Sequence, residues 1–178
     1  VVVDEKLDGA NLGFSRSLGG ELRTQNRGQY LQAPFSGQFA RLPDWLSLHG
    51  EAVHTALTVH ADAGLMLFGE WCAARHSLDY DHLPDWFLLF DVYERKTQRF
   101  WSTARRNALA AEWGLASVPL LYQGRCTMAN LRAMLDEYPS RYRQGPLEGV
   151  VIPQTIADHW SQRRFEWNRV DWAEAKGV

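Results

Sequence analysis

The sequence has little of what several protein classes require. Its 178 residues include only two cysteines, Cys72 and Cys126, which lack the spacing of a metal site, in a chain too long to need a disulfide. We therefore expect a reducing compartment and a cytoplasmic location. No apolar run approaches the ~20 residues of a membrane span, so no membrane contact is expected. A net charge of −2 excludes a broadly basic nucleic-acid footprint and leaves only local arginine patches.

Lysine is also scarce, and this directs attention to one residue. The three lysines are Lys6, Lys96 and Lys176. Lys6 follows three valines and Glu5 and precedes Leu-Asp-Gly, a pattern typical of a strand that ends in a glycine turn. An amine held at a rigid strand end can attack phosphorus or a carbonyl when its neighbours keep it neutral. The alternative is a solvated lysine beside Glu5 and Asp8.

Apolar runs bounded by turn residues predict most of the chain's strands. Strands are expected over residues 1–6, 65–71, 86–93, 118–122, 148–152 and 164–170, and residues 98–101 are expected to return beside 86–93. Two more, 12–16 and 21–25, are expected to pair across Gly19 and Gly20, because glycine tolerates the positive φ of a tight turn.

Three helical stretches are expected in the connections. The first covers residues 36–60, with breaks near Pro43 and Gly50. Ser102 is a typical N-cap for a helix that runs to Trp113, and Thr127 is a typical N-cap for the third. With 46% hydrophobic residues the chain can build a core, so one domain is expected. The fold class is α+β, with mainly antiparallel sheet and flanking helices.

Three acidic residues accompany apolar strands. Glu70 follows a glycine inside Leu-Phe-Gly-Glu-Trp, Asp91 ends Phe-Leu-Leu-Phe-Asp, and Glu148 opens Glu-Gly-Val-Val-Ile. Because side chains repeat every two residues along a strand, Phe87 and Asp91 are expected on one face. Buried carboxylates need a partner or a cation, which predicts a shared polar pocket. Alternatively, each acid caps a strand or pairs with an arginine.

The order of these motifs resembles the covalent nucleotidyltransferase superfamily of ligases and capping enzymes. Lys-x-Asp-Gly, Phe-Gly-Glu-Trp, Phe-x-x-Phe-Asp and Glu-Gly-Val-Val follow one another at suitable spacing over residues 3–152. Within that superfamily the chain is most similar to the RNA ligase 2 group of ATP-dependent RNA ligases. Arg27-Gly28 and the Ser-Thr-Ala-Arg-Arg stretch from Ser102 also match that group. The resemblance implies one nucleotidyltransferase domain over residues 1–178, built around an ATP pocket.

The resemblance also implies the chemistry and its residues. Lys6 would attack the α-phosphorus of ATP and form lysyl-adenylate, with Asp8 and Glu148 as the other catalytic residues. The AMP would pass to an RNA 5′-phosphate before a 3′-hydroxyl seals the strand. ATP would be bound by further residues: Glu5, Arg27, Glu70, Phe87 (stacked on adenine) and Arg164. Glu148 and Glu70 would hold Mg²⁺ or Mn²⁺, in part through water.

The chain departs from the family pattern near its end. In the segment Arg163 to Arg169, Glu166 stands where the family has a lysine that grips the α-phosphate. A carboxylate facing a phosphate is repulsive by at least ~1 kcal/mol. Arg163 or Arg164 substitutes for the lysine, or Glu166 points away, or adenylation is impaired. Little chain follows Val170, so we expect no separate C-terminal domain, a few N-terminal residues missing before Val1, and a protein partner for RNA-end recognition.

Two alternatives to an RNA ligase stay open at this level. One is related chemistry, in a DNA ligase core or a capping guanylyltransferase. The other is a non-catalytic nucleotide- or RNA-binding module, which Glu166 favours. Two basic pairs also have two readings each. Arg75-His76 could contact a phosphate or belong to a surface loop, and Arg105-Arg106 could face RNA or form a solvated helix face. The oligomeric state is not predicted.

Overall fold

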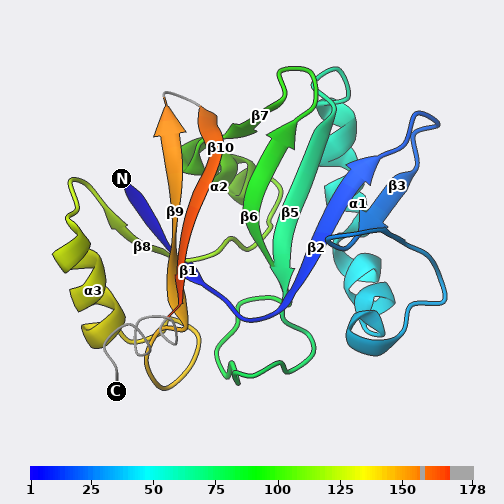
Figure 1. Cartoon of the computed structure of the whole chain (residues 1–178). Coiled ribbons are helices and arrows are strands. Elements are labelled where there is room, and N and C mark those ends of the chain that lie inside the picture. The colour runs from blue at the N-terminus through cyan, green and yellow to red at the C-terminus, as the bar shows by residue number, and fades with distance from the viewer. Residues whose placement is uncertain (157–158, 169–178) are drawn as a thin grey trace.

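The computed structural model describes residues 1–156 and 159–168 and has an α+β fold (Figure 1). Its described strands form a single ten-stranded sheet in the order β4-β3-β2-β5-β6-β7-β10-β9-β1-β8, with every strand pair antiparallel. The strands are β1 (Val2–Lys6), β2 (Ala10–Arg16), β3 (Leu22–Gln25), β4 (Tyr30–Leu31), β5 (Leu65–Trp71), β6 (Phe87–Glu94), β7 (Arg99–Trp101), β8 (Leu120–Gln123), β9 (Gly149–Ile156) and β10 (His159–Asn168).

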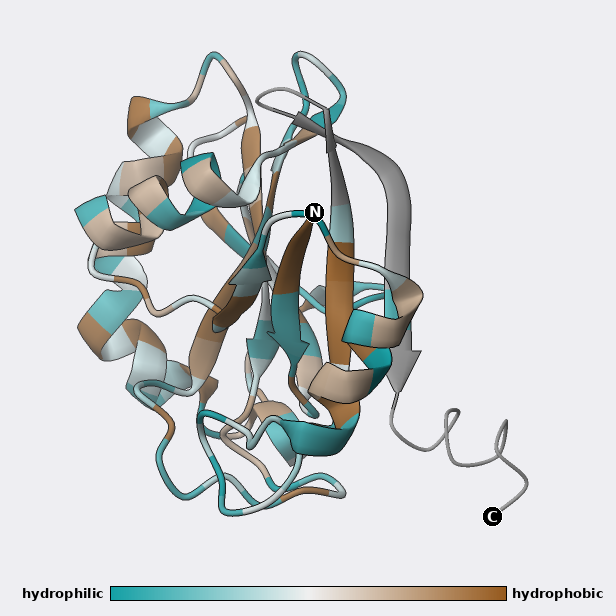
Figure 2. Cartoon of the chain, turned by 90° about the vertical axis from the view of Figure 1, so that its left-hand side faces the viewer, coloured by the Kyte–Doolittle hydropathy of each residue, from teal (hydrophilic) through white to brown (hydrophobic). Residues whose placement is uncertain are grey.

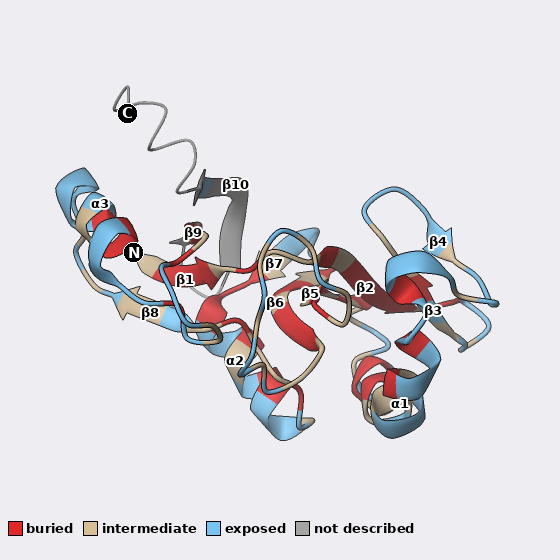
Figure 3. Cartoon of the chain, turned by 90° about the horizontal axis from the view of Figure 1, so that it is seen from below, coloured by how far each residue is buried: buried red, intermediate tan, exposed pale blue. Residues whose placement is uncertain are grey.

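The larger core packs helix α1 (Leu42–Val59) against β2, β5 and β6. Trp45 and Val53 of the helix meet Phe14 of β2, Leu67 of β5 and Leu89 of β6, all almost fully buried. Figure 3 shows these three strands mostly buried, with α1 exposed on its outer side. Figure 2 shows that the helices carry both hydrophobic and hydrophilic residues. An amphipathic helix covering an apolar sheet face accounts for this half.

A smaller core holds the other half of the sheet. Helix α3 (Met128–Glu137) places Leu131 and Leu135 against Val3 of β1 and Val150 of β9. A third cluster, with Leu7, Cys72, Leu88 and Val118, joins the two halves beneath the end of β1. The last residue of β1, Lys6, therefore lies where the halves meet.

The predicted elements are largely confirmed. The hairpin turns through Gly20, whose φ is +92°, and β7 returns beside β6. Helix α2 (Thr103–Glu112) begins after its N-cap Ser102, and Thr127 caps α3 in a capping box with Asn130. The predicted break near Pro43 is confirmed, because a 3₁₀ helix ends at Phe39 and α1 begins only at Leu42, with Pro43 in its first turn, where a missing N–H costs nothing. The predicted break near Gly50 is wrong, because Gly50 lies within a continuous helix.

A few other boundaries differ. A short 3₁₀ helix (Gly37–Phe39) precedes α1, and β4 was not anticipated because two residues carry no periodic pattern. Residues 169 and 170 of the last predicted strand lie outside the described residues. Within the described part of the chain, no helix has the length and apolar character needed to cross a membrane.

Candidate active site

A polar cavity of about 200 Å³ lies at the junction of the two halves of the sheet. Its walls come from β1, the turn after it, β2, β5, β6, β9 and β10. Among the lining residues are Lys6, Arg27, Glu70 and Asp91, with Phe90 and Val151 as apolar surfaces. Residues separated by more than a hundred positions in the sequence thus face one space.

Lys6, which lines the cavity, forms a pair with Glu148, the residue that precedes β9. Lys6 Nζ donates a hydrogen bond to Glu148 Oε1 in an ion pair, and both side chains are about one-fifth exposed. Burial raises the pKa of Glu148; the bond and charge of Lys6 offset this in part, and the carboxylates of Asp8 and Glu166 raise it further. The second oxygen, Oε2, is buried without a hydrogen-bond partner among the described residues. The pair therefore holds an amine beside a carboxylate that still has an acceptor to offer.

Glu70 fixes the turn that follows Lys6. Its Oε1 accepts a hydrogen bond from the Gly9 N–H at 3.0 Å, and Glu70 lies opposite Asn11 in the β2–β5 ladder. Asn11 also lines the cavity, yet the sequence analysis did not select it. Its position two residues after a glycine turn was the available signal.

Asp8 lines the cavity but is bonded to the loop between β5 and β6. Its Oδ2 accepts from the backbone N–H groups of Ser77, at 2.8 Å, and Leu78, at 3.1 Å, and also from the Ser77 hydroxyl. Its own N–H donates to the Tyr80 hydroxyl at 2.6 Å. Partial burial raises the pKa of Asp8, but these hydrogen bonds outweigh that effect and lower it. Asp8 therefore ties the loop to the turn beside Lys6.

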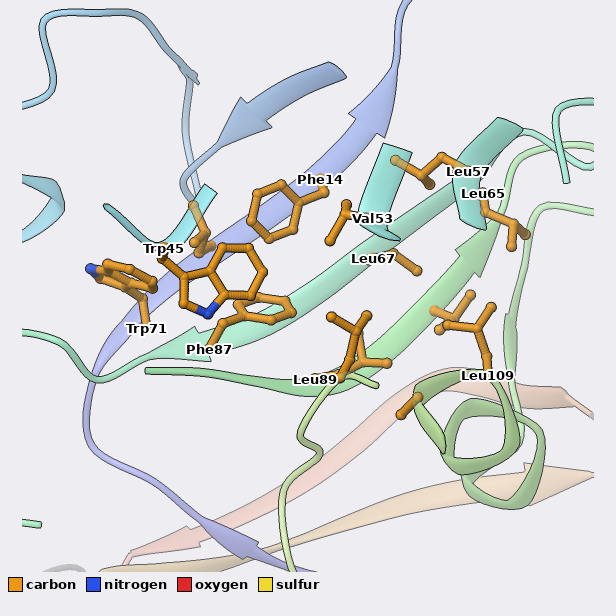
Figure 4. Packing of buried hydrophobic residues seen from close by; sticks show 14 of the residues in the cluster. Phe14, Trp45, Val53, Leu57, Leu65, Leu67, Trp71, Phe87, Leu89 and Leu109 are labelled. Carbon is orange, nitrogen blue, oxygen red and sulfur yellow. The ribbon is translucent and has the colours of Figure 1, made fainter. Parts of the chain in front are cut away.

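The structure corrects the expected position of Phe87. This ring is fully buried in the larger core, where it packs against Phe14 and Trp45 with centroids 5.0 and 5.4 Å away (Figure 4). Phe90 lines the cavity instead. A Cβ on Gly69 would collide with the Phe87 ring and lie 2.7 Å from the Leu88 carbonyl, so the glycine makes room for the buried ring.

A β-bulge explains the correction. Asp91 pairs with Phe68 and Leu89 pairs with Gly69, so Phe90 is an extra residue on β6. A bulge interrupts the alternation of side chains along a strand. Phe87 and Leu89 consequently face the core, whereas Phe90 and Asp91 both reach the cavity. The period-two rule put Phe87 and Asp91 on one face, and one inserted residue reverses that.

The other residues predicted to bind ATP, Arg27, Glu5 and Arg164, lie in different places relative to the cavity. Arg27 lines the cavity from an exposed turn. The buried Glu5 carboxylate accepts hydrogen bonds from Ser140 Oγ, at 2.5 Å, and from the Arg141 N–H, at 3.0 Å. Burial raises the pKa of Glu5, an effect that those bonds oppose. Glu5 therefore adjoins the cavity with its side chain already bonded. The backbone of Arg164 on β10 pairs with Pro153 on β9. Its side chain is not among those that the structure describes.

Glu166 faces the cavity and does not turn away from it. It lies beside Val151 on β9, which in turn lies beside Asp4 on β1, so the three residues form one row across the sheet. Its carboxylate is close enough to raise the pKa of Glu148. The possibility that Glu166 points away, one of the three raised by the sequence, is thereby removed.

Arg106 is buried, contrary to a solvated helix face. It is 2% exposed, and its Nη1 donates to Asp4 Oδ2 at 2.9 Å and to the Phe90 carbonyl at 2.8 Å. Arg105 lies over the ring of Trp101, with its guanidinium carbon 3.6 Å from the ring centroid. One guanidinium thus connects the strand of Lys6 with the bulge of Phe90, an arrangement that spacing in the sequence does not reveal.

The donor set fits a divalent cation that keeps most of its water. Among the described residues no group of three histidine, cysteine or acidic side chains lies close enough to hold a metal alone. Mg²⁺ commonly uses one or two carboxylates together with water and substrate phosphates. The unpartnered Glu148 Oε2 and the cavity-lining Glu70 are suitable for such a role.

The antiparallel α+β architecture is that of nucleotidyltransferase-fold proteins, and here it carries a lysine that lines a polar cavity and is bonded to a glutamate. The chain belongs to the RNA ligase family, whose family model matches residues 1–167. None of the curated proteins matches the chain.

Solved structures of similar fold include Naegleria gruberi RNA ligase with PPi, which is 18% identical with a TM-score of 0.71 over 99% of this chain. A point mutant of that enzyme with ATP and Mn gives 18% identity and a TM-score of 0.70 over 98% of this chain. In both comparisons the alignment covers 51% of the Naegleria chain. This chain therefore spans about half the length of those proteins, and the likeness establishes the fold.

Proposed function

We propose that this chain is the adenylating part of an ATP-dependent RNA ligase. The observation that carries the proposal is the amine of Lys6, which lines the cavity together with Phe90 and is bonded to Glu148. Membership of the RNA ligase family supports RNA ends as the substrate. The Naegleria structures with ATP, AMP and Mn support ATP and a divalent cation as its requirements.

The cavity offers a contact for each part of the nucleotide. Phe90 presents an aromatic face suited to stack on adenine, the role that the sequence analysis gave to Phe87. Arg27 brings a guanidinium whose fork of donors suits a phosphate or ribose. Glu70 lines the same space and accepts hydrogen bonds, as a ribose hydroxyl requires.

The adenylation step is a substitution at phosphorus. The lone pair of Lys6 Nζ forms a bond to the α-phosphorus, the bond from that phosphorus to the bridging oxygen breaks, and pyrophosphate leaves. The amine must lose a proton to attack, and Glu148 Oε1 already accepts a hydrogen bond from it. Burial favours the protonated form of Glu148, which makes it suitable to take that proton. A divalent cation, when bound, neutralises charge on the phosphates.

Intact-mass measurement after incubation with ATP and Mg²⁺ tests the proposal. We expect a gain of one AMP that disappears in Lys6→Ala. Lys96→Ala is the matched control, because Lys96 is exposed on the hairpin between β6 and β7 and should leave the adduct unchanged. Absence of an adduct at every pH between about 6 and 9 would overturn the catalytic role.

Glu166 favours one alternative, a module that binds nucleotide without reacting with it. Its carboxylate faces the space that the α-phosphate would occupy if Lys6 is the nucleophile. Binding of ATP without any covalent adduct would support this alternative. GTP in place of ATP separates a capping guanylyltransferase, and a DNA substrate separates a DNA ligase core. A protein partner for end recognition and a cytoplasmic location complete the proposal.

A further inference from the structure

The residues on both sides of Lys6 are held by two connections that lie far from β1 in the sequence. Glu5 precedes Lys6, and its buried carboxylate accepts hydrogen bonds from the Ser140 hydroxyl and the Arg141 N–H. Asp8 follows Lys6, and its carboxylate accepts from two backbone N–H groups in the connection between β5 and β6. The strand end that carries the amine is therefore attached to a different connection on each side.

The connection between β5 and β6 also holds the backbone of the turn after β1. The Tyr80 hydroxyl accepts a hydrogen bond from the Asp8 N–H at 2.6 Å. The Tyr80 ring packs against the third core cluster, which contains Leu7. One aromatic residue therefore bonds the turn through its hydroxyl and packs through its ring into the cluster beneath that turn.

The connection between α3 and β9 closes on itself before the chain reaches Glu148. Residues 139–146 form a small loop, with an antiparallel bridge between their two end residues and a hydrogen bond from the Ser140 N–H to the Gly145 carbonyl at 2.9 Å. The next residue, Leu147, is almost fully buried in the smaller core. The serine that bonds β1 is thus joined to Glu148 through a closed loop and a buried leucine.

One backbone carbonyl joins the two connections, which Figure 1 shows at the same end of the sheet. The Tyr142 carbonyl accepts hydrogen bonds from the N–H groups of Asp81 and His82, both at 3.1 Å. The Ser140 hydroxyl in turn accepts from the Tyr142 N–H at 3.2 Å. Hydrogen bonds therefore follow a closed path that leaves β1 on one side of Lys6 and returns on the other.

This path uses oxygens that the sequence analysis assigned to other roles. Each carboxylate oxygen of Glu5 accepts one bond from the chain, and Asp8 Oδ2 accepts three, from Ser77 and Leu78. A buried carboxylate that lost such partners would carry a large desolvation cost. The two acidic residues beside Lys6 are therefore suited to hold the chain in place.

We infer that the two connections act as one clamp, in which Tyr80 and Ser140 are positioning residues that hold the amine of Lys6 in place for attack on ATP. The inference rests on the proposed function above. Neither residue is among the described lining residues of the Lys6 cavity, so they act through Asp8 and Glu5. A small displacement of a reacting group lowers the rate strongly, which gives the clamp its effect on the reaction.

Removal of the two hydroxyls, singly and together, tests the inference. Tyr80→Phe and Ser140→Ala each delete one hydroxyl oxygen. Tyr122→Phe and Ser47→Ala are the matched controls, because each of those hydroxyls bonds a nearby backbone carbonyl outside the clamp. Intact mass gives the rate of adduct formation at saturating ATP and the ATP concentration that gives half that rate. All rates are compared at a temperature below every variant's denaturation midpoint.

We expect each single variant to slow adduct formation at saturating ATP roughly three- to tenfold, as for one hydrogen bond. The half-saturating ATP concentration should stay within about twofold, because the lost interaction does not bind the nucleotide. The double variant should be little slower than the slower single variant, since both bonds belong to one closed path. Wild-type rates in the single variants, losses that multiply in the double variant, or a change confined to the half-saturating concentration overturns the inference.

Hydrogen exchange provides a measurement that requires no adduct. The N–H groups of Asp81 and His82 are bonded across the clamp, so Ser140→Ala should speed their exchange several-fold, whereas Ser47→Ala should not. If the wild type forms no adduct, the adenylation proposal fails, and exchange then decides the clamp by itself. Faster exchange in Ser140→Ala supports the clamp, and unchanged exchange overturns it.

Discussion

At the scale of single residues, the site depends on carboxylates in unlike surroundings. Glu148 faces the amine, Glu70 holds the turn, Asp8 binds a loop, and Glu5 is bonded to Ser140 and Arg141. The first of these carboxylates is the one bonded to Lys6. The acidic residues that surround one lysine in the sequence therefore do different work, and their hydrogen bonds distinguish them.

Two phenylalanines on one strand should respond oppositely to truncation. Phe90→Ala removes an aromatic face of the cavity, so we expect weaker ATP binding in the adenylation assay and a small change in stability. Phe87→Ala opens a void in the larger core, and the free energy of unfolding should fall by about 3–5 kcal/mol. Chemical denaturation and the ATP dependence of adduct formation measure the two effects. The opposite pattern would restore Phe87 as the stacking residue.

Replacing the carboxylate of Glu166 should accelerate adenylation. Glu166→Lys converts a repulsion of the α-phosphate into an attraction, and we expect a faster gain of AMP at limiting ATP, by roughly tenfold or more for a difference of 1.4 kcal/mol. Glu166→Gln should give an intermediate rate because it removes only the repulsion. Equal rates in all three proteins would show that the carboxylate is remote from the nucleotide phosphates.

Much of the residue-level picture was accessible from the sequence. The sequence analysis selected Lys6, Glu70, Arg27 and Asp8, and all four line the cavity. Asn11 and Phe90 were missed. Phe90 was missed for a physical reason, because a bulge depends on pairing with a distant strand and leaves no periodic signal in its own segment.

At the scale of elements, helix α2 fixes two strands of the site through one side chain. Arg106 joins Asp4 on β1 to the Phe90 carbonyl on β6, so the strand of the nucleophile and the bulge share a single buried cation. The Ser102 hydroxyl caps this helix by accepting from the Arg105 N–H at 3.3 Å, which sets where the helix begins. The cap was readable from the sequence, but the burial of Arg106 required the tertiary structure.

Removing the Arg106 guanidinium should lower stability and disturb the site together. Arg106→Met leaves Asp4 as a buried carboxylate without its cation, a change that typically costs about 3–5 kcal/mol. We expect a lower denaturation midpoint and, below that midpoint, slower adenylation with weaker ATP dependence. Arg105→Met is the control, because Arg105 is partly exposed over Trp101. Similar losses in both variants would contradict a special role for Arg106.

At the scale of the whole molecule, two cores support one sheet. The α+β class and the antiparallel pairing followed from apolar periodicity and turn residues, which are local. The strand order did not, because β1 pairs with β8 and β9, far along the chain. Long-range pairing brings Glu148 to Lys6, 142 residues away, and no local pattern specifies it.

The stability of the whole molecule should depend on pH through Asp8. Its pKa is lowered from the ordinary value of 3.8, so its ionised form favours the folded state. That contribution is present above about pH 3.8 and is lost as the pH falls through the lower folded-state pKa. Asp8→Asn should therefore be less stable than wild type near neutrality and approach it in acid. Urea titrations at several pH values measure the difference, and a constant gap would refute the linkage.

The third core cluster gives the molecule a built-in reporter. Cys72 lies there with Leu7, directly after β1, and burial raises the pKa of its thiol, whereas Cys126 is only partly buried. A thiol-reactive dye should consequently modify Cys126 first. The rate at which Cys72 becomes labelled then measures how often the third core cluster, which lies between the two larger ones, opens to solvent. A nucleotide bound in the Lys6 cavity should slow the labelling of Cys72, because Leu7, Phe90 and Val118 belong to both the cavity wall and this cluster. This measurement of nucleotide binding requires no catalytic turnover.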